Sequence, residues 1–255
     1  MRIVVKVGTS TLAHATGRLN IRHVEELVKV LSDLKNAGHE IILVSSGAIG
    51  MGVGKLNLPG KPSDMPTKQA AAAVGQCELM YTYDRLFLAY NHTVAQVLLT
   101  GEDVDHPERR ENFENTMERL LELGALPIIN ENDTIATAEI KVGDNDTLGA
   151  IVACCVRADL LVLLSDIEGL YTADPRKDPA ATLIPVVEEV TPDIEALAGG
   201  VGSSLGTGGM ATKLRAAKMV TAQGCDMVIT NGERPDRLYD IAQGKAVGTR
   251  FLAKK

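Results

Sequence analysis

Short apolar runs alternate with helical patterns along the whole chain, and this alternation limits the available folds. The runs are rich in Ile, Leu and Val and occupy residues 3–7, 41–44, 94–99, 126–129, 160–164 and 227–230. Short runs that are apolar throughout are typical of strands buried on both faces, as in a parallel sheet covered by helices. The sequence therefore predicts an α/β fold, a three-layer sandwich with a mostly parallel central sheet.

Helical patterns fill the intervals between these runs. Asn20 is typical of an N-cap, and apolar residues at helical spacing follow it until Gly38. Further helices are expected near residues 67–90, 112–123, 147–156, 212–223 and 234–242. We expect a single domain over residues 1–255 with an N-terminal lobe of about 1–150 and a C-terminal lobe of about 151–255. No Pro/Gly/Ser-rich tether separates the lobes, so they are expected to share one sheet.

Composition excludes several classes of protein. The chain has 255 residues, of which 45% are hydrophobic, and this excludes disordered and fibrous classes. A net charge of −7 argues against nucleic acid as a partner, since phosphate backbones require a clustered basic face. No apolar stretch reaches the roughly 18 residues of a membrane span. The four cysteines form no C-x-x-C pair, which favours reduced thiols and a cytoplasmic location.

Polar or glycine-containing segments follow four of the predicted strands. In parallel sheets, ligands bind beyond the carboxyl ends of the strands, so these segments indicate a binding site. They are Gly8-Thr9-Ser10, Ser45-Ser46-Gly47, Asn130-Glu131-Asn132-Asp133 and Ser165-Asp166.

A glycine-rich segment, residues 205–213, runs directly into a predicted helix. Glycines let backbone N–H groups approach a ligand, the helix start adds partial positive charge, and Lys213 adds a full charge, which suits an oligophosphate. Lys6 lies in a buried strand, where lysine is rare without a partner. The two lysines form a candidate pair of phosphate-neutralising cations. The alternatives are a flexible surface loop for the segment and an edge-strand lysine for Lys6.

Residues 144–146, Asp-Asn-Asp, precede the helix expected from Thr147. One of them could serve only as the N-cap of that helix. Three short polar residues exceed what a cap requires, so a carboxylate here could hold the two lysines and the amide could bind a polar substrate.

The sequence does not fully match other motifs that bind nucleotides or metal ions. Residues 50–55 resemble part of a P-loop but lack its first glycine and its Ser/Thr. Residues 206–211 fit a loose dinucleotide fingerprint without a strand directly before it. No zinc spacing and no H-E-x-x-H are present, so no metal-ligating residues are predicted.

These residues and several further blocks resemble the amino acid kinase family. The matching blocks, in the family's order along the whole chain, are residues 5–10, 44–49, 72–76, 129–133, 136–146, 169–175 and 206–213. Residues 129–146 are similar to the branch that phosphorylates the side-chain carboxylate of glutamate in proline synthesis. The resemblance implies the amino acid kinase fold, ATP and Mg²⁺ as cofactors, glutamate as substrate, a homo-oligomer (dimer or tetramer) and proline as a feedback inhibitor. Many members of the branch carry a C-terminal PUA domain, and a form without it is expected here.

The resemblance also implies roles for individual residues. Lys6 and Lys213 would contact the ATP phosphates, and Asp146 would orient both lysines. Ser46, Asp133 and Asn145 would hold glutamate. The nucleotide would also contact Ser165, Asp166, Thr207, Gly208, Gly209, Met210, Ala211 and Thr212.

Three alternatives stay open at this point. Another kinase of the same family could act on acetylglutamate, aspartate, carbamate or UMP. The chain could also be a catalytically silent binding module, or a nicotinamide-dependent dehydrogenase that uses residues 206–211.

Overall fold

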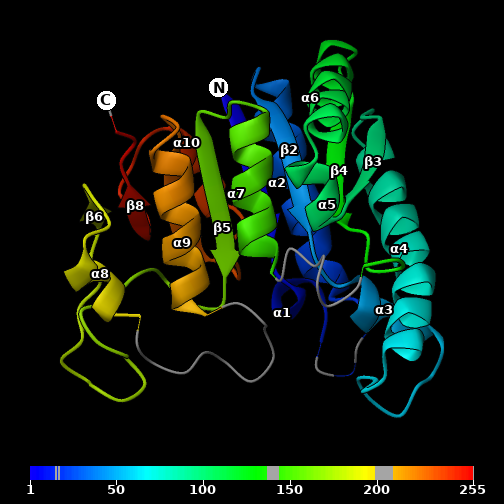
Figure 1. Ribbon diagram of the computed structural model, residues 1–255, viewed down its shortest axis with the longest axis horizontal. Coiled ribbons are helices and arrows are strands. Elements are labelled where there is room, and N and C mark those ends of the chain that lie inside the picture. The colour runs from blue at the N-terminus through cyan, green and yellow to red at the C-terminus, as the bar shows by residue number, and fades with distance from the viewer. Residues whose placement is uncertain (15, 17, 137–143, 199–208, 255) are drawn as a thin grey trace.

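The computed structural model describes residues 1–14, 16, 18–136, 144–198 and 209–254 (Figure 1). Within these residues the strands are β1 (Arg2–Val7), β2 (Glu40–Ser45), β3 (Val94–Leu99), β4 (Leu126–Glu131), β5 (Leu160–Ser165), β6 (Val186–Val187), β7 (Asp226–Asn231) and β8 (Thr249–Phe251). All six predicted strands are confirmed. The strands β6 and β8 were missed because two or three residues are too few to show a pattern.

The described strands form one sheet in the order β3-β4-β2-β1-β5-β7-β8-β6. Every neighbouring pair is parallel except β7 and β8, which are antiparallel. The predicted mostly parallel sheet, continuous across both halves of the chain, is therefore confirmed. The division into two lobes remains a prediction.

Helices fill the connections between the strands. Their bounds are α1 (Thr9–Leu12), α2 (Ile21–Asn36), α3 (Ala48–Lys55), α4 (Met65–Leu88), α5 (Gly101–Asp105), α6 (Pro107–Glu122), α7 (Asn145–Cys155), α8 (Pro192–Ala196), α9 (Met210–Thr221) and α10 (Arg237–Ala242). The predicted cap of α2 is confirmed, since the Asn20 side chain accepts a hydrogen bond from His23 N. The helix α3 covers the residues that resemble part of a P-loop, so the rejection of that motif is confirmed.

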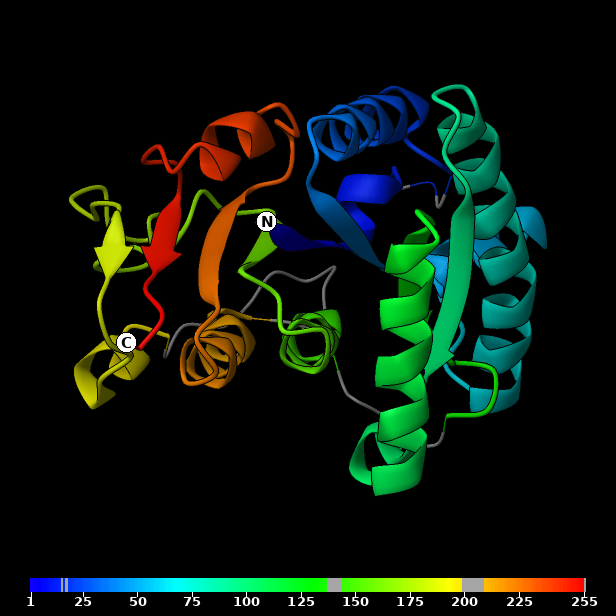
Figure 2. The same ribbon diagram turned by 90° about the horizontal axis from the view of Figure 1, so that it is seen from above.

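Helices cover both faces of the sheet (Figure 2), and an apolar core lies on each face. The helices α6, α7 and α9 pack on one face, against strand residues such as Val4 and Leu163. The helices α2, α4 and α10 pack on the other, against residues such as Val5 and Val162. Because side chains alternate along a strand, each central strand contributes to both cores, as continuous apolar runs require.

The carboxyl ends of the parallel strands lie at one edge of the sheet. In Figure 1 the arrow of β5 points to the lower edge, and α7 and α9 begin there. The turns that follow β1, β2 and β4 reach the same edge because these strands run parallel to β5. Within the described part of the chain, no helix has the length and apolar character needed to cross a membrane.

Candidate active site

A single carboxylate joins two lysines from distant parts of the chain. Lys6 Nζ donates to Asp146 Oδ1 at 2.7 Å, and Lys213 Nζ donates to Asp146 Oδ2 at 2.8 Å. All three side chains are buried, with exposed fractions of 8% for Lys6, 5% for Lys213 and 1% for Asp146. The structure thus brings together the three residues predicted to form the catalytic centre.

The sheet and two helices explain this convergence. Lys6 lies on the same face of β1 as Val4, two positions before it, and that face is covered by α7 and α9. Asp146 lies in the first turn of α7, and Lys213 lies in the first turn of α9. The helices α7 and α9 pack side by side (Figure 2), and the Asp146 carboxylate in the first turn of α7 bonds both Lys213 and Lys6.

The electrostatics of this cluster favour an anionic ligand. Burial alone would raise the pKa of Asp146, but the charges of Lys6 and Lys213 outweigh it and lower the pKa to about 2. Asp146 is therefore ionised at neutral pH, and the three side chains carry a net charge of +1. The partial positive charges at the first turns of α7 and α9 add to this potential.

Thr212 places its hydroxyl group between the same carboxylate and a backbone carbonyl group, with one hydrogen for the two acceptors. Its hydroxyl lies 3.1 Å from Asp146 Oδ2 and 2.7 Å from the carbonyl oxygen of Gly209, the residue before α9. The hydroxyl links the start of α9 to Asp146, so Lys213 is held by its own bond and by that of its neighbour.

A second group of polar side chains lies beside the lysines. Asn145 Nδ2 is 2.6 Å from Ser46 Oγ, 3.0 Å from the carbonyl oxygen of Ser45 and 3.3 Å from Asn130 Oδ1. Asp144 caps α7 by accepting from Thr147 N, so one residue of the Asp-Asn-Asp segment is indeed a cap. The next residue, Asn145, belongs to this polar group, whereas Asp146 belongs to the lysine cluster.

The other predicted site residues lie at the same edge without joining the lysine cluster. Asp133 is in the turn after β4 and is partly buried. Ser165 ends β5, and its hydroxyl donates to Asp166 Oδ1 at 3.1 Å. Gly209, Met210 and Ala211 begin α9 beside Lys213, whereas Thr207 and Gly208 are outside the described residues.

Sequence reasoning missed four contributors on the substrate side. Asn130 is the penultimate residue of β4 and Ser45 ends β2, and both contact Asn145. Both lie in the polar segments at the predicted strand ends, but neither was among the predicted site residues. Gln76 and Tyr83 lie on α4 and hydrogen-bond to Asn130 and Ser45, respectively. Gln76 ends one of the family-like blocks, but nothing in its spacing indicated this contact.

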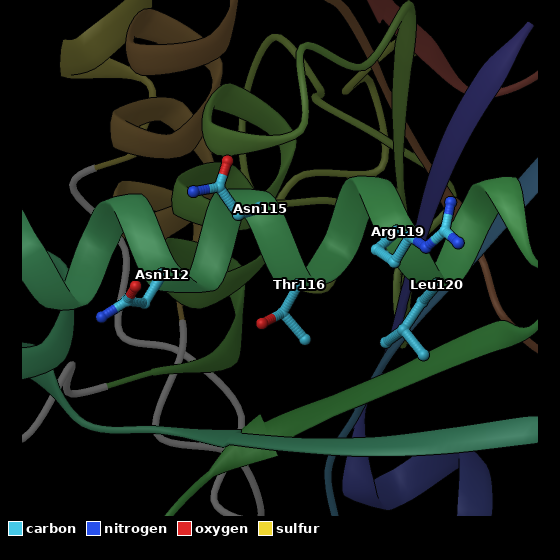
Figure 3. A pocket seen from close by; sticks show the side chains of 5 residues that line it. All are labelled: Asn112, Asn115, Thr116, Arg119 and Leu120. Carbon is cyan, nitrogen blue, oxygen red and sulfur yellow. The ribbon is translucent and has the colours of Figure 1, made fainter.

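A shallow hollow lies elsewhere, on the outer side of α6. Its five lining residues all project from that one helix (Figure 3): Asn112, Asn115, Thr116, Arg119 and Leu120. It contains none of the predicted site residues and no converging charges. The described residues also include no cluster of three His, Cys, Asp or Glu side chains able to hold a metal ion.

Comparison with known proteins identifies the family of this chain. The model of the amino acid kinase family matches residues 1–231. The chain belongs to this family. Family membership replaces the dehydrogenase interpretation of residues 206–211.

Two curated relatives are similar over nearly their whole length. A glutamate 5-kinase of Listeria innocua serovar 6a is 54% identical over 258 residues, covering 100% of this chain and 94% of the relative. A glutamate 5-kinase of Clostridium tetani is 56% identical over 253 residues, covering 99% of this chain and 95% of the relative.

A solved structure of the family supports the fold. A carbamate kinase from Giardia lamblia bound to AMP-PNP superposes with a TM-score of 0.71 at 19% identity, covering 99% of this chain and 98% of that one. At this identity the likeness concerns the fold alone.

Proposed function

We propose that this protein has glutamate 5-kinase activity: it transfers the γ-phosphoryl group of ATP to the side-chain carboxylate of L-glutamate, giving L-glutamyl 5-phosphate and ADP. The observation that carries the proposal is the single buried carboxylate between the ammonium groups of Lys6 and Lys213. The choice of glutamate is supported by curated relatives of that name, which are 52–56% identical over essentially the whole chain.

The chemistry requires charge neutralisation rather than a base. A glutamate side chain has an ordinary pKa of about 4.3, so the nucleophile is already ionised at neutral pH. The barrier arises because an anion must approach a polyanion. Positioning and electrostatic stabilisation therefore dominate catalysis, as in other phosphoryl transfers.

The two lysines supply that stabilisation on the nucleotide side. Lys6 and Lys213 each use one N–H on Asp146, and an ammonium group has three, so both retain donors for phosphate oxygens. Asp146 acts by holding the ammonium groups in place. With a pKa of about 2, it is too weak a base to remove a proton at neutral pH. In this proposal Ser165, Asp166 and the start of α9 also contact the nucleotide.

The amide of Asn145 serves the acceptor side. Its nitrogen faces inward, toward the oxygen atoms of Ser46, Ser45 and Asn130, which leaves its carbonyl oxygen as the atom presented to a ligand. A carbonyl oxygen accepts from an ammonium group, so it suits the α-amino group of an amino acid. We propose Ser46 and Asp133 as the other glutamate-binding residues.

We propose that Mg²⁺ accompanies ATP. Because the described residues form no cage of three acidic or imidazole ligands, the phosphate oxygens and water would provide most of its coordination. When bound, the ion supplies further neutralisation of phosphate charge.

Three further properties stay predictions. The four free cysteines are consistent with a reducing cytoplasm. A homo-oligomer and inhibition by proline follow from the family resemblance, and sedimentation and inhibition curves would test them.

One experiment tests the activity itself. ADP release is measured with and without L-glutamate, and hydroxylamine is added to trap the acyl phosphate as a hydroxamate. We expect glutamate-dependent ADP release with a matching amount of hydroxamate. Release that is equal for glutamate, aspartate, acetylglutamate, carbamate and UMP, or absent with glutamate, would overturn the proposal.

A further inference from the structure

Two side chains of α4 support the acceptor side of the site without lining it. Gln76 Oε1 accepts from Asn130 Nδ2 at 2.9 Å, and Asn130 Oδ1 is 3.3 Å from Asn145 Nδ2. The hydroxyl of Tyr83 is 2.9 Å from Ser45 Oγ, and the Ser45 carbonyl oxygen accepts from the same Asn145 nitrogen at 3.0 Å. Two separate hydrogen-bond routes thus lead from α4 to the side-chain amide of Asn145, one through Asn130 and one through Ser45.

The donors and acceptors along both routes are consistent. Ser45 Oγ donates to the Ser46 carbonyl oxygen at 3.2 Å, so the Tyr83 hydroxyl supplies the proton of its bond to Ser45. Asn130 uses Nδ2 on Gln76, and its Oδ1 also accepts from Glu131 N, which fixes the orientation of this amide. The orientation of Asn145 is fixed in turn, because its nitrogen faces acceptors from both routes.

These groups are deeply buried, so their hydrogen bonds are costly to lose. The exposed fraction is 0% for Tyr83 and Ser45, 3% for Asn130 and 8% for Gln76. Burial also raises the pKa of Tyr83 above its ordinary value, so its hydroxyl stays protonated. A buried donor that loses its acceptor destabilises the folded protein by its full desolvation free energy.

The position of α4 is set by close backbone contact with α3, the helix that follows Ser46. A Cβ atom on Gly75 would lie 1.7 Å from the carbonyl oxygen of Ala48, and one on Gly52 would lie 1.8 Å from that of Ala71. Only glycine permits this approach. Gln76 and Tyr83 are seven residues apart, which is about two helical turns, so they share one face of α4 and reach two different strand ends.

We propose that Gln76 and Tyr83 are positioning residues for the acceptor substrate, acting through Asn130 and Ser45 to hold the Asn145 amide in its binding orientation. This inference rests on the proposed function, because the role of Asn145 is defined by the acceptor amino acid.

The test compares Gln76→Met and Tyr83→Phe, which remove one polar group each at nearly constant size. Thr82→Val is the matched control, because the Thr82 hydroxyl is also buried on α4 but, among the described residues, bonds only to the carbonyl oxygen of Glu78. We expect each test variant to raise the KM for glutamate about five- to tenfold, the effect of one lost hydrogen bond, and to leave the KM for ATP unchanged. Thr82→Val should leave both KM values unchanged even where it lowers the Tm.

A double-mutant cycle with Asn145→Ala separates positioning from general destabilisation. The quantity measured is kcat/KM for glutamate, which needs no saturation. If Gln76 and Tyr83 act through Asn145, their substitutions should change kcat/KM less than about twofold once Asn145 is truncated.

The outcomes are distinct. Undiminished effects in the Asn145→Ala background, or an equal rise in the KM for ATP, would overturn the positioning role and leave the proposed function intact. If the unaltered protein shows no glutamate-dependent hydroxamate, the proposed function fails and the inference fails with it.

Discussion

Replacing Asp146 by asparagine keeps the shape of the side chain and removes the negative charge that Lys6 and Lys213 share. The variant therefore imitates the wild-type protein with Asp146 protonated. The ordinary pKa of 3.8 falls to about 2 in the folded protein. At about 1.36 kcal/mol for each pKa unit, this difference corresponds to about 2 kcal/mol of folding stability at pH 7.

The direction of the pH dependence follows from the depressed pKa. A carboxyl group that ionises more readily when folded stabilises the protein above its unfolded pKa, and this stabilisation disappears as pH falls through the folded value. The stability difference between wild type and Asp146→Asn should therefore be about 2 kcal/mol at pH 7 and about half of that at pH 3.

Urea unfolding followed by far-UV circular dichroism at pH 7, 5, 4 and 3 would measure this difference. Asp240→Asn is the matched control, because Asp240 forms an exposed ion pair with Lys245 and its loss should cost less than about 1 kcal/mol. A stability difference for Asp146→Asn no larger than that of the control, or one that stays constant from pH 7 to pH 3, would refute the reasoning. Turnover should also fall by about 100-fold or more, since the ammonium groups lose the carboxylate that orients them.

Three further outcomes follow from the structure. Lys6→Ala and Lys213→Ala should each lower kcat by about 100-fold or more while changing the Tm far less, and near-normal turnover in either would contradict its contact with the phosphates. Asp133→Ala should raise the KM for glutamate, and a fall in kcat alone would move Asp133 out of the acceptor site. Gly75→Ala should destabilise the protein by about 1–3 kcal/mol, because the new methyl group meets a backbone oxygen of α3, whereas Gly60→Ala, which meets no atom within 4 Å, should not; equal Tm values would contradict the close packing.

Strands and helices were predicted correctly where neighbouring residues form a clear apolar pattern, and were missed where contacts with distant residues stabilise them. The run that became β5 is apolar over five residues, and the run that became β1 is apolar apart from Lys6, so their burial on both faces could be predicted from the sequence alone. The strands β6 and β8 are two and three residues long and exist only because they pair with each other and with β7. The helix α3 contains three glycines, which weaken a helical pattern, and its packing against α4 stabilises it.

The site shows the same division. The chain itself determined which charged groups were available: a lysine inside a buried strand, a lysine at a helix start and a carboxylate at another helix start. Because ligands of parallel sheets bind beyond the carboxyl ends of the strands, these groups could also be expected at that edge of the sheet.

Only the tertiary structure decided which groups touch. Lys6 and Lys213 are 140 and 67 positions from Asp146 along the chain, and no spacing rule specifies that one carboxylate binds both. The contributions of Gln76 and Tyr83 depend on how closely α4 approaches α3, which is set by backbone contact at glycines. The periodicity of apolar residues indicates which face of a helix or strand is buried. Hydrogen-bond partners from different elements depend on distances that exist only once the helices have packed on the sheet.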